Sequence, residues 1–174
     1  MNKDILICGV GGQGTVLASK LTASAAMREG NIVHSAETIG MAQRGGSVTS
    51  HVRIGDKAFS PLIGGSVIVN SHPVKPITES LNDTGYDGTK MIEFLKSHKV
   101  KTCVVDADEI CKPFGSSKFF NIIILGVATG AGLLGISKDS MILEIEQKVK
   151  AKFVDINKKA FAAGIKVGEE YAAQ

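Results

Sequence analysis

The pattern of apolar and polar positions alternates between strand-like and helix-like periods along the chain. Apolar runs or strict two-residue alternation predict strands at residues 5–8, 31–35, 47–54, 66–70 and 100–105. Helical spacing is found at residues 15–29, 89–97, 117–132, 138–149 and 154–171. We expect Ser116 or Ser117 to cap the third of these helices and Ser137 to cap the fourth. Strands that alternate with helices predict one α/β domain over residues 1–174. We expect a Rossmann-like, mainly parallel sheet with flanking helices and a helical C-terminal end.

A glycine-rich segment joins the first predicted strand to the first predicted helix. Gly9, Gly11 and Gly14 match G-x-G-x-x-G in this strand-to-helix context, where the pattern serves a tight turn and close approach of a ligand. The helix N-terminus then offers free N–H groups and a partial positive charge to an anion. Glu37 follows roughly 20 residues later, where a ribose-binding acid lies in dinucleotide folds. The candidate cofactor-binding residues here are Gly9, Gly11, Gly12, Gln13, Gly14 and Glu37. Close helix–strand packing alone is the structural alternative.

The region after residue 54 departs from a simple alternation of strands and helices. Gly55-Asp56 has turn chemistry, and residues 57–63 can return as a hairpin arm. Only Gly64-Gly65 then precedes the run 66–70, whereas a parallel crossover needs a dozen or more residues. We therefore expect either an antiparallel strand at 66–70 or a missing crossover.

Acidic and cysteine residues do not form an evident metal or redox motif. Asp106 and Asp108 follow a predicted strand, and without a partner cluster we interpret them as strand-end and helix-cap residues. Three cysteines in no C-x-x-C spacing argue against an iron–sulfur cluster, a structural zinc or a disulfide framework within this chain. Cys8 and Cys103 lie in apolar runs and are predicted to be core residues.

Composition narrows the remaining classes of function. Twenty basic and 17 acidic residues give a net charge of +3 without long blocks, so we expect no nucleic-acid surface. The apolar run 119–136 approaches membrane length, yet it contains Asn121, Thr129 and four glycines, which favours a buried helix or a protein contact. Gly126 and Gly130 share one helix face and would admit another backbone. The chain starts directly in a core strand, and we expect a cytoplasmic protein that does not enter a membrane.

Two motifs in order resemble the gamma-type subunit of the 2-oxoacid:ferredoxin oxidoreductases. The first is the segment 9–14. The second is Glu-Thr-Ile-Gly-Met-Ala-Gln-Arg-Gly-Gly-Ser-Val at 37–48, followed by His-Val-Arg-Ile-Gly at 51–55. Within it, the segment Gly-Met-Ala-Gln-Arg-Gly-Gly at 40–46 is most similar to the corresponding segment of indolepyruvate ferredoxin oxidoreductase subunit beta. The resemblance covers nearly the whole chain. Family members usually carry a further strand and helix between residues 63 and 64; if these are deleted here, one sheet edge and part of the subunit interface will differ.

The resemblance implies a subunit role rather than an independent enzyme. Such enzymes decarboxylate a 2-oxo acid on thiamine diphosphate, pass electrons through iron–sulfur clusters to ferredoxin and transfer the acyl group to coenzyme A. We expect thiamine diphosphate, magnesium and the clusters in a larger partner subunit, and this chain as a possible homodimer when isolated. Gln43 and Arg44 would act at the interface with the active site; an internal salt bridge of Arg44 that shapes the loop is the alternative. Gly45 and Gly46 are further candidate cofactor-binding residues, which would allow close approach or shape the turn. The alternative is a stand-alone nucleotide-binding, NAD-type Rossmann protein.

Overall fold

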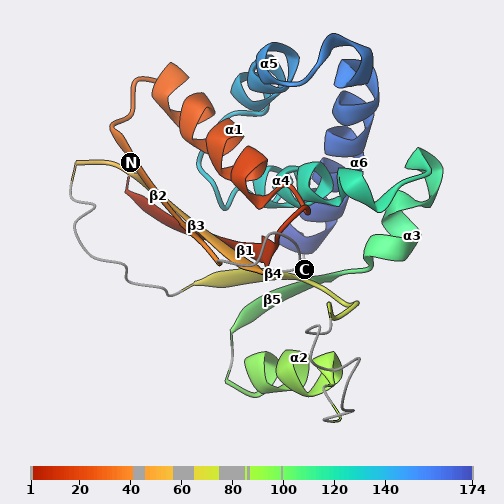
Figure 1. Ribbon diagram of the computed structural model, residues 1–174. Helices are drawn as coiled ribbons and strands as arrows, with labels where there is room; N and C mark the ends of the chain where they lie inside the picture. Colours follow the sequence, from red (N-terminus) through yellow and green to blue (C-terminus); the bar gives the residue numbers. More distant parts are fainter. Residues whose placement is uncertain are drawn as a thin grey trace.

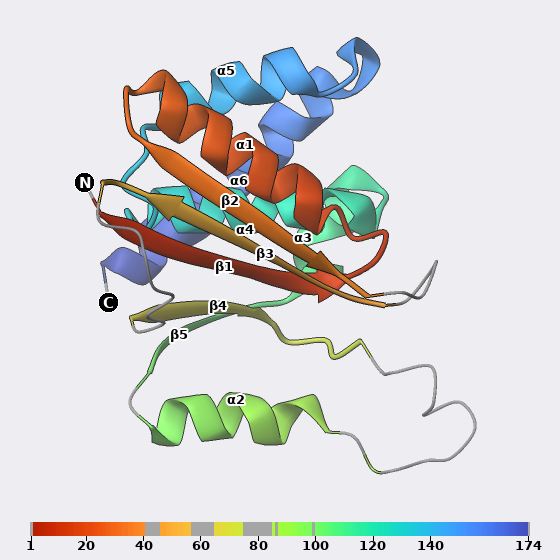
Figure 2. The same cartoon turned by 60° about the vertical axis from the view of Figure 1, so that its left-hand side comes forward.

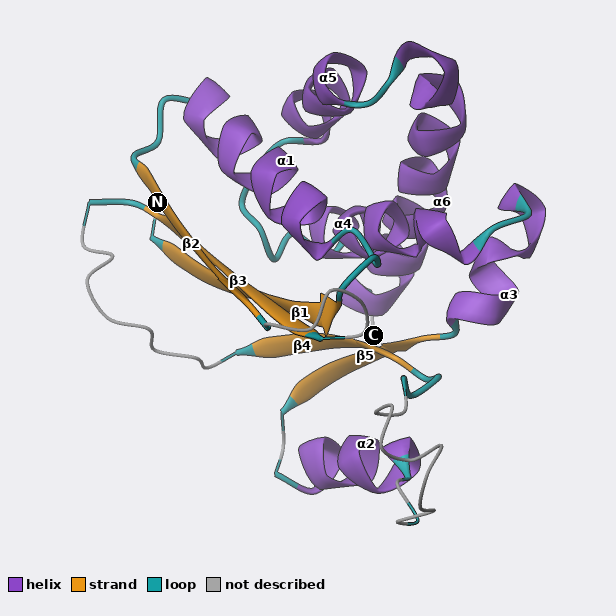
Figure 3. Ribbon diagram, viewed as in Figure 1, coloured by secondary structure: helices purple, strands orange, loops and turns teal. Residues whose placement is uncertain are grey.

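The protein is organised as one layered α/β unit. The computed structural model describes residues 2–40, 46–56, 65–74, 85, 87–98 and 100–173. Five strands form the middle layer, and α1, α4, α5 and α6 lie on one face, with α2 on the opposite side beneath β4 and β5 (Figures 1 and 2). Figure 3 shows that the C-terminal part of the chain is helical. The predicted α/β class, the flanking helices and the helical C-terminal end are confirmed.

The strands and helices follow the predicted order. The strands are β1 Lys3–Val10, β2 Val33–Ile39, β3 Ser47–Ile54, β4 Ser66–Asn70 and β5 Lys101–Val105. The helices are α1 Thr15–Arg28, α2 Gly88–Ser97, α3 Ala107–Cys111, α4 Phe120–Gly130, α5 Lys138–Lys148 and α6 Val154–Ala172. Predicted caps are confirmed where a side-chain oxygen precedes a helix: Asp106 caps α3 and Ser137 caps α5.

The described strand pairing is mixed rather than mainly parallel as predicted: β4–β5 is parallel, whereas β1–β3 and β2–β3 are antiparallel. β3 pairs antiparallel with both β1 and β2 and lies between them, which gives the order β1-β3-β2. The physical reason is the short connection of residues 40–46, which permits a reversal but is too short for a parallel crossover. Because both neighbours run against β3, β1 and β2 still point in the same direction.

The second strand group settles one of the two alternatives for residues 66–70. β4 pairs parallel with β5, with Ser66 opposite Lys101 and Asn70 opposite Val105. In both views β4 lies alongside β1 (Figures 1 and 2). The strand is therefore not an antiparallel partner of β5. The predicted hairpin arm 57–63 and the junction between 63 and 64 lie outside the described residues.

The core is built around α1, α4 and α6. α4 has six buried residues and no exposed one, as the apolar run predicted, and its glycines let α6 approach at backbone distance. A Cβ placed on Gly126 would lie 2.3 Å from the carbonyl oxygen of Phe161, and one on Gly164 would lie 2.0 Å from that of Ile123. Any side chain at these positions would force the helices apart. The predicted close approach is confirmed.

No single helix among the described residues is long and apolar enough to cross a bilayer. The helical stretches 107–114 and 117–130 are together long and apolar enough, but they are bent by 108° relative to each other.

The prediction for Cys8 is wrong and that for Cys103 is confirmed. Cys103 is buried beside Val105 and Val127, whereas Cys8 is exposed. Alternation along β1 turns Ile5 and Ile7 towards the helices and Cys8 to the opposite face, which α1 does not cover. The apolar run itself did not reveal which of its positions faced the helices.

Candidate functional site

The glycine loop connects the carboxyl end of β1 to the N-terminus of α1. Gly12 and Gly14 have φ of 98° and 79°, a region that L side chains rarely adopt. Gly14 is also the residue that precedes α1, and no side chain caps this helix. Gly9 and Gly11 lie outside this left-handed region, so the turn requires glycine at positions 12 and 14 for its backbone conformation.

Gln13 holds the loop closed on itself. Its side-chain Oε1 accepts a hydrogen bond from the Val10 N–H at 2.8 Å, and its own N–H donates to the Val10 carbonyl at 3.0 Å. A Cβ on Gly9 would lie 2.5 Å from Thr15 Oγ1 and 3.0 Å from Gln13 Oε1. Glycine at position 9 therefore makes room for the side chains that close the loop.

The structure brings the two sequence motifs together. The Gly11 N–H donates to the Gly46 carbonyl at 2.9 Å, and Gly9 and Val10 pair with the first residues of β3. Across the neighbouring pair of strands, the Gly40 N–H donates to the Ser47 carbonyl at 2.9 Å. The end of the second motif therefore contacts the glycine loop directly. Gln43, Arg44 and Gly45 lie outside the described residues, so their predicted roles remain predictions.

Asn121 is a contact of the glycine loop that the sequence did not identify. Its Nδ2 donates to the Gly14 carbonyl at 3.3 Å, and a Cβ on Gly14 would lie 2.4 Å from that nitrogen. Its Oδ1 accepts from the Ile122 N–H at 2.9 Å. The only sequence signal was a polar residue at the start of an apolar helix. Asn121 thus joins the first turn of α1 to α4 across 107 residues of chain.

Glu37 is positioned differently from a ribose-binding acid in a doubly wound dinucleotide fold. There the first two strands are neighbours, whereas here β3 separates β1 from β2. Glu37 accepts a hydrogen bond from Ser19 Oγ on α1 at 3.2 Å and lies opposite the buried Ser50. The carboxylate is thus already engaged by the second turn of α1. A ligand-binding role for Glu37 stays a prediction.

The described donor groups do not form an iron–sulfur site. The sequence has three cysteines, one fewer than the four thiolates that hold an all-cysteine cluster. Burial raises the pKa of the Cys103 thiol; burial and then the Asp108 carboxylate raise that of Cys111. Both thiols therefore stay protonated at neutral pH. Among the described residues no group of three or more His, Cys, Asp or Glu side chains is arranged to hold a metal ion.

A polar clasp formed by His72, Asp106 and Asp108 lies at the end of the β4–β5 pair. His72 Nδ1 lies 3.6 Å from Asp106 Oδ1, and its Nε2 lies 3.4 Å from Asp108 Oδ2. The Glu109 N–H holds the pKa of Asp106 below its usual value; slight burial opposes this shift and His72 adds to it. Asn70 Oδ1 accepts from the Ala107 N–H and from His72 N, so the clasp ties β4 to α3.

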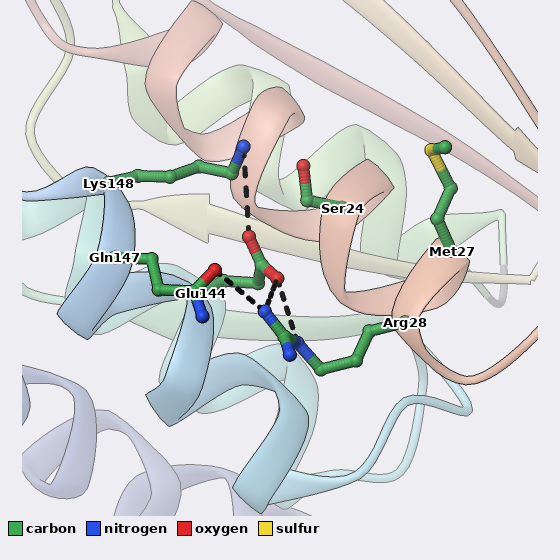
Figure 4. A pocket seen from close by; sticks show the side chains of 6 residues that line it. All are labelled: Ser24, Met27, Arg28, Glu144, Gln147 and Lys148. Carbon is green, nitrogen blue, oxygen red and sulfur yellow. Dashed lines mark hydrogen bonds and ion pairs between the residues drawn. The ribbon is translucent and has the colours of Figure 1, made fainter.

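A separate hollow lies at the other end of α1. It has a volume of about 370 Å³ and is lined by Ser24, Met27, Arg28, Glu144, Gln147 and Lys148 (Figure 4). Arg28 donates to Glu144 Oε1 from Nε at 2.9 Å and from Nη2 at 2.6 Å, and Lys148 lies 3.7 Å from Oε2. The Arg28 Nη2 also donates to Gln147 at 2.8 Å. Arg28, Glu144 and Lys148 already pair with one another, so these contacts hold α1 against α5.

Comparisons with known proteins agree with the two motifs. Residues 4–167 match the family described as pyruvate ferredoxin/flavodoxin oxidoreductase. The chain is 34% identical to the indolepyruvate oxidoreductase subunit IorB of Archaeoglobus fulgidus over 190 residues, covering 94% of each chain. It is 32% identical to the common subunit gamma of the pyruvate and ketoisovalerate oxidoreductases of Thermococcus kodakarensis, covering 75% of this chain and 79% of that one.

A solved structure shows the same fold. The gamma subunit of a keto/oxoacid ferredoxin oxidoreductase from Geobacter sulfurreducens superimposes with a TM-score of 0.69 at 24% identity, over 96% of this chain and 98% of that one. The alignment with the Archaeoglobus subunit is longer than the 174 residues of this chain, so that relative contains residues without a counterpart here. By its motifs, its match over residues 4–167 and its relatives, this chain belongs to the pyruvate ferredoxin/flavodoxin oxidoreductase family and is a subunit of a 2-oxoacid:ferredoxin oxidoreductase.

Proposed function

We propose that this chain is the small subunit of an indolepyruvate ferredoxin oxidoreductase, acting on indolepyruvate or other aryl pyruvates. In the complete enzyme the oxo acid is oxidatively decarboxylated to an acyl-coenzyme A, and the electrons pass to ferredoxin. The similarity to an indolepyruvate oxidoreductase subunit over 94% of both chains supports this substrate class. The 32% identity to a subunit shared by pyruvate and ketoisovalerate enzymes keeps those acids as the competing substrates.

We further propose that the larger partner subunit holds thiamine diphosphate, magnesium and the iron–sulfur clusters. The three cysteines of this chain cannot supply the four ligands of a cluster, and two of them are buried. Thiamine diphosphate, when bound in the partner, would supply the decarboxylation chemistry. This chain would contribute a surface that positions the acyl acceptor or closes the partner's active site. A cytoplasmic location stays a prediction from the sequence.

The role proposed for that surface rests on one observation, the hydrogen bond from the Gly11 N–H to the Gly46 carbonyl. It joins the glycine loop to the end of the Gly-Met-Ala-Gln-Arg-Gly-Gly motif at one edge of the sheet. Ligands of open α/β sheets bind at the carboxyl ends of the strands. The two motifs contain the carboxyl ends of β1 and β2. The surface formed by both motifs thus faces the partner, and Arg44 offers a bidentate donor to a carboxylate, a phosphate or the partner backbone.

The first experiment identifies the complex and its substrate. The tagged full-length chain is isolated anaerobically from its own cells, and the eluate is assayed for oxo-acid-dependent reduction of ferredoxin or a viologen dye with coenzyme A. Co-elution of a large thiamine diphosphate and iron–sulfur subunit, with indolepyruvate turned over faster than pyruvate, 2-oxoisovalerate and 2-oxoglutarate, supports the proposal. Faster turnover of one of these competitors would overturn the substrate assignment and retain the subunit role.

The second experiment tests Arg44 with a matched pair of variants. Arg44→Ala removes the charge and the planar donor, whereas Arg44→Lys keeps the charge and loses the bidentate geometry. We expect both variants to fold and to bind the large subunit, with turnover reduced at least tenfold in the alanine variant and less in the lysine variant. Full turnover in the alanine variant would contradict the functional role. Loss of complex assembly would instead assign Arg44 to scaffolding.

The NAD-type alternative is tested on the isolated chain. In dinucleotide folds the ribose-binding acid follows a strand that is next to β1. Here β3 separates β1 from β2, and Glu37 already accepts a hydrogen bond from Ser19, so the ribose site of those folds is not reproduced. Titration with NAD by calorimetry is therefore expected to give no heat of binding. A saturable signal that Glu37→Ala abolishes would favour the stand-alone alternative.

A further inference from the structure

The start of α1 is held by a side chain that lies far away in the sequence. Asn121, in the first turn of α4, donates from Nδ2 to the Gly14 carbonyl at 3.3 Å. Among the hydrogen bonds described for residues 9–14, this is the one that comes from another helix. The others join residues of the loop to each other, to α1 or to the second motif and β3. The position of the loop relative to α4 therefore depends on this amide.

The helix that carries Asn121 is a rigid support. Gly126 and Gly130 bring α4 into backbone contact with α6 and leave no room for a side chain. Ile122, the next residue after Asn121, is 1% exposed, and its N–H donates to Asn121 Oδ1 at 2.9 Å. Close-packed interiors yield little to small forces. Asn121 thus presents its Nδ2 to the loop from a fixed place and in a fixed orientation.

The bond from Asn121 orients one peptide group at the start of α1. The Gly14 carbonyl and the Thr15 N–H belong to the same planar peptide unit, so a bond that holds the oxygen also sets the direction of the N–H. Gly12 and Gly14 have no side chains that would restrict the rotation of this peptide by themselves. The Thr15 N–H is one of the first-turn donors without a partner inside the helix. Asn121 therefore determines where this donor points.

The same turn has a second polar group on the side of the loop. Thr15 is 6% exposed, and a Cβ on Gly9 would lie 2.5 Å from Thr15 Oγ1, so the hydroxyl lies directly beside the loop. Within the described part of the chain this hydroxyl makes no hydrogen bond. Largely buried polar groups normally have a partner, from the protein, a ligand or water. The start of α1 therefore offers an oriented N–H and an unpartnered hydroxyl at the end of β1.

We propose that Asn121 is a positioning residue for the binding of coenzyme A. It holds the first turn of α1 in the orientation that receives the coenzyme at the surface formed by the glycine loop and the second motif. This inference rests on the proposed function, because it takes that surface to be the one that positions the acyl acceptor. Asn121 acts through the Gly14–Thr15 peptide. Its replacement should therefore change the affinity for coenzyme A and leave the affinity for the oxo acid unchanged.

Asn121→Asp removes the donor and changes little else. The aspartate keeps the size of the side chain and an acceptor for the Ile122 N–H, and a negative charge in the first turn of a helix is favourable. The variant should therefore fold and assemble with the large subunit. In the assembled enzyme we expect KM for coenzyme A to rise about five- to tenfold, the effect of about one hydrogen bond, with KM for the oxo acid unchanged. Calorimetric titration with coenzyme A alone should show the same factor in Kd.

Asn157→Asp is the matched control. Asn157 is 7% exposed and donates from Nδ2 to the Phe153 carbonyl at 2.7 Å, within the last helix and away from the loop. The same substitution there removes a largely buried amide donor, so it should lower the free energy of unfolding and leave both KM values unchanged. If Asn121→Asp also leaves KM and Kd for coenzyme A unchanged, or if Asn157→Asp raises them equally, the proposal is overturned.

A double variant separates positioning from stability. In Gly14→Ala the new Cβ meets Asn121 Nδ2, so adding Asn121→Ala removes the clash and should recover part of the lost free energy of unfolding. KM for coenzyme A should nevertheless stay raised, because the orienting amide is missing. If KM returns to the wild-type value together with stability, Asn121 acts through stability alone and the proposal falls.

The Arg44 variant shows which of the two proposals has failed. If Arg44→Ala reduces turnover and Asn121→Asp changes neither KM nor Kd for coenzyme A, the proposed surface stands and the positioning role of Asn121 falls. If the wild-type complex has no oxo-acid turnover that depends on coenzyme A, the proposed function falls and this inference falls with it.

Discussion

The two ends of α1 are held by different kinds of interaction. At its N-terminus, left-handed Gly12 and Gly14, the Gln13 amide and Asn121 hold a loop made mainly of backbone. At its C-terminus, Arg28 and the buried Glu144 hold the helix to α5 through charged side chains (Figure 4). The charged end has the hollow, yet Arg28 and Lys148 already share the Glu144 carboxylate. The uncharged end contacts the family motif and has backbone groups at the edge of the sheet.

From this difference we expect the hollow with its paired charges to be structural and the glycine loop at the end of β1 to be functional. The ion pairs lie at the opposite end of α1 from the surface that we propose to face the partner. The glycine loop is part of that proposed surface. Variants at the N-terminal end should therefore alter complex activity, and variants at the C-terminal end should alter stability alone.

The largest effect is expected for Gly14→Ala. A side chain there must adopt a left-handed backbone and meets Asn121 Nδ2, so we expect a loss of about 2–3 kcal/mol in the free energy of unfolding, measured by urea denaturation. Gly12→Ala is the matched control, because its Cβ meets nothing within 4 Å and only backbone strain remains. Equal losses in both variants would show that contact with Asn121 is unimportant.

The next effect is expected for Glu144→Ala at the opposite end of the helix. Its removal leaves Arg28 and Lys148 without their shared carboxylate, and we expect a loss of about 1–2 kcal/mol, reduced by the partial exposure of Arg28. Turnover of the assembled complex at 25 °C should stay at the wild-type level. Glu146→Ala, which removes an exposed pair with Lys158, is the control for a surface ion pair. Reduced turnover in Glu144→Ala would break the distinction between the two ends.

Replacement of Gln13 sharpens the comparison at the glycine loop. Gln13→Ala frees the Val10 N–H at a cost of about 0.5–1 kcal/mol, whereas Gln13→Glu retains an acceptor and adds a negative charge. If the loop receives a phosphate of coenzyme A, the glutamate variant should raise KM for coenzyme A more than KM for the oxo acid. Unchanged KM values in both variants would separate the loop from coenzyme A binding.

The smallest effect concerns Glu29, immediately after α1. Slight burial opposes its ionisation, but hydrogen bonds from Ser137 and Ser140 outweigh burial and lower its pKa below 4.5. A lowered pKa in the folded state stabilises the protein above the unfolded value, and this contribution disappears as pH falls through the folded value. Thermal melting from pH 7 to pH 3 should therefore show a slightly smaller decline in Glu29→Gln than in wild type. Glu170→Gln, at an exposed position on α6, should follow the wild-type curve.

Most elements were predictable because their signals are local. The periodicity of Ser47–Ile54, the cap at Ser137 and the spacing of Gly126 and Gly130 each depend on a few neighbouring residues. The exposure of Cys8 was not predictable, because an apolar run shows no alternation that assigns its faces. The contact between Asn121 and Gly14 was also missed, since it joins residues 107 positions apart.

The sequence by itself determined the family, the order of strands and helices, and the two motifs, because these depend on residue type and local spacing. Only the tertiary structure decided that β3 lies between β1 and β2, that Gly46 closes on Gly11, and that the edge of β2 is exposed. The physical reason is that strand pairing depends on chain reversals and on the burial of distant faces, which local periodicity does not specify.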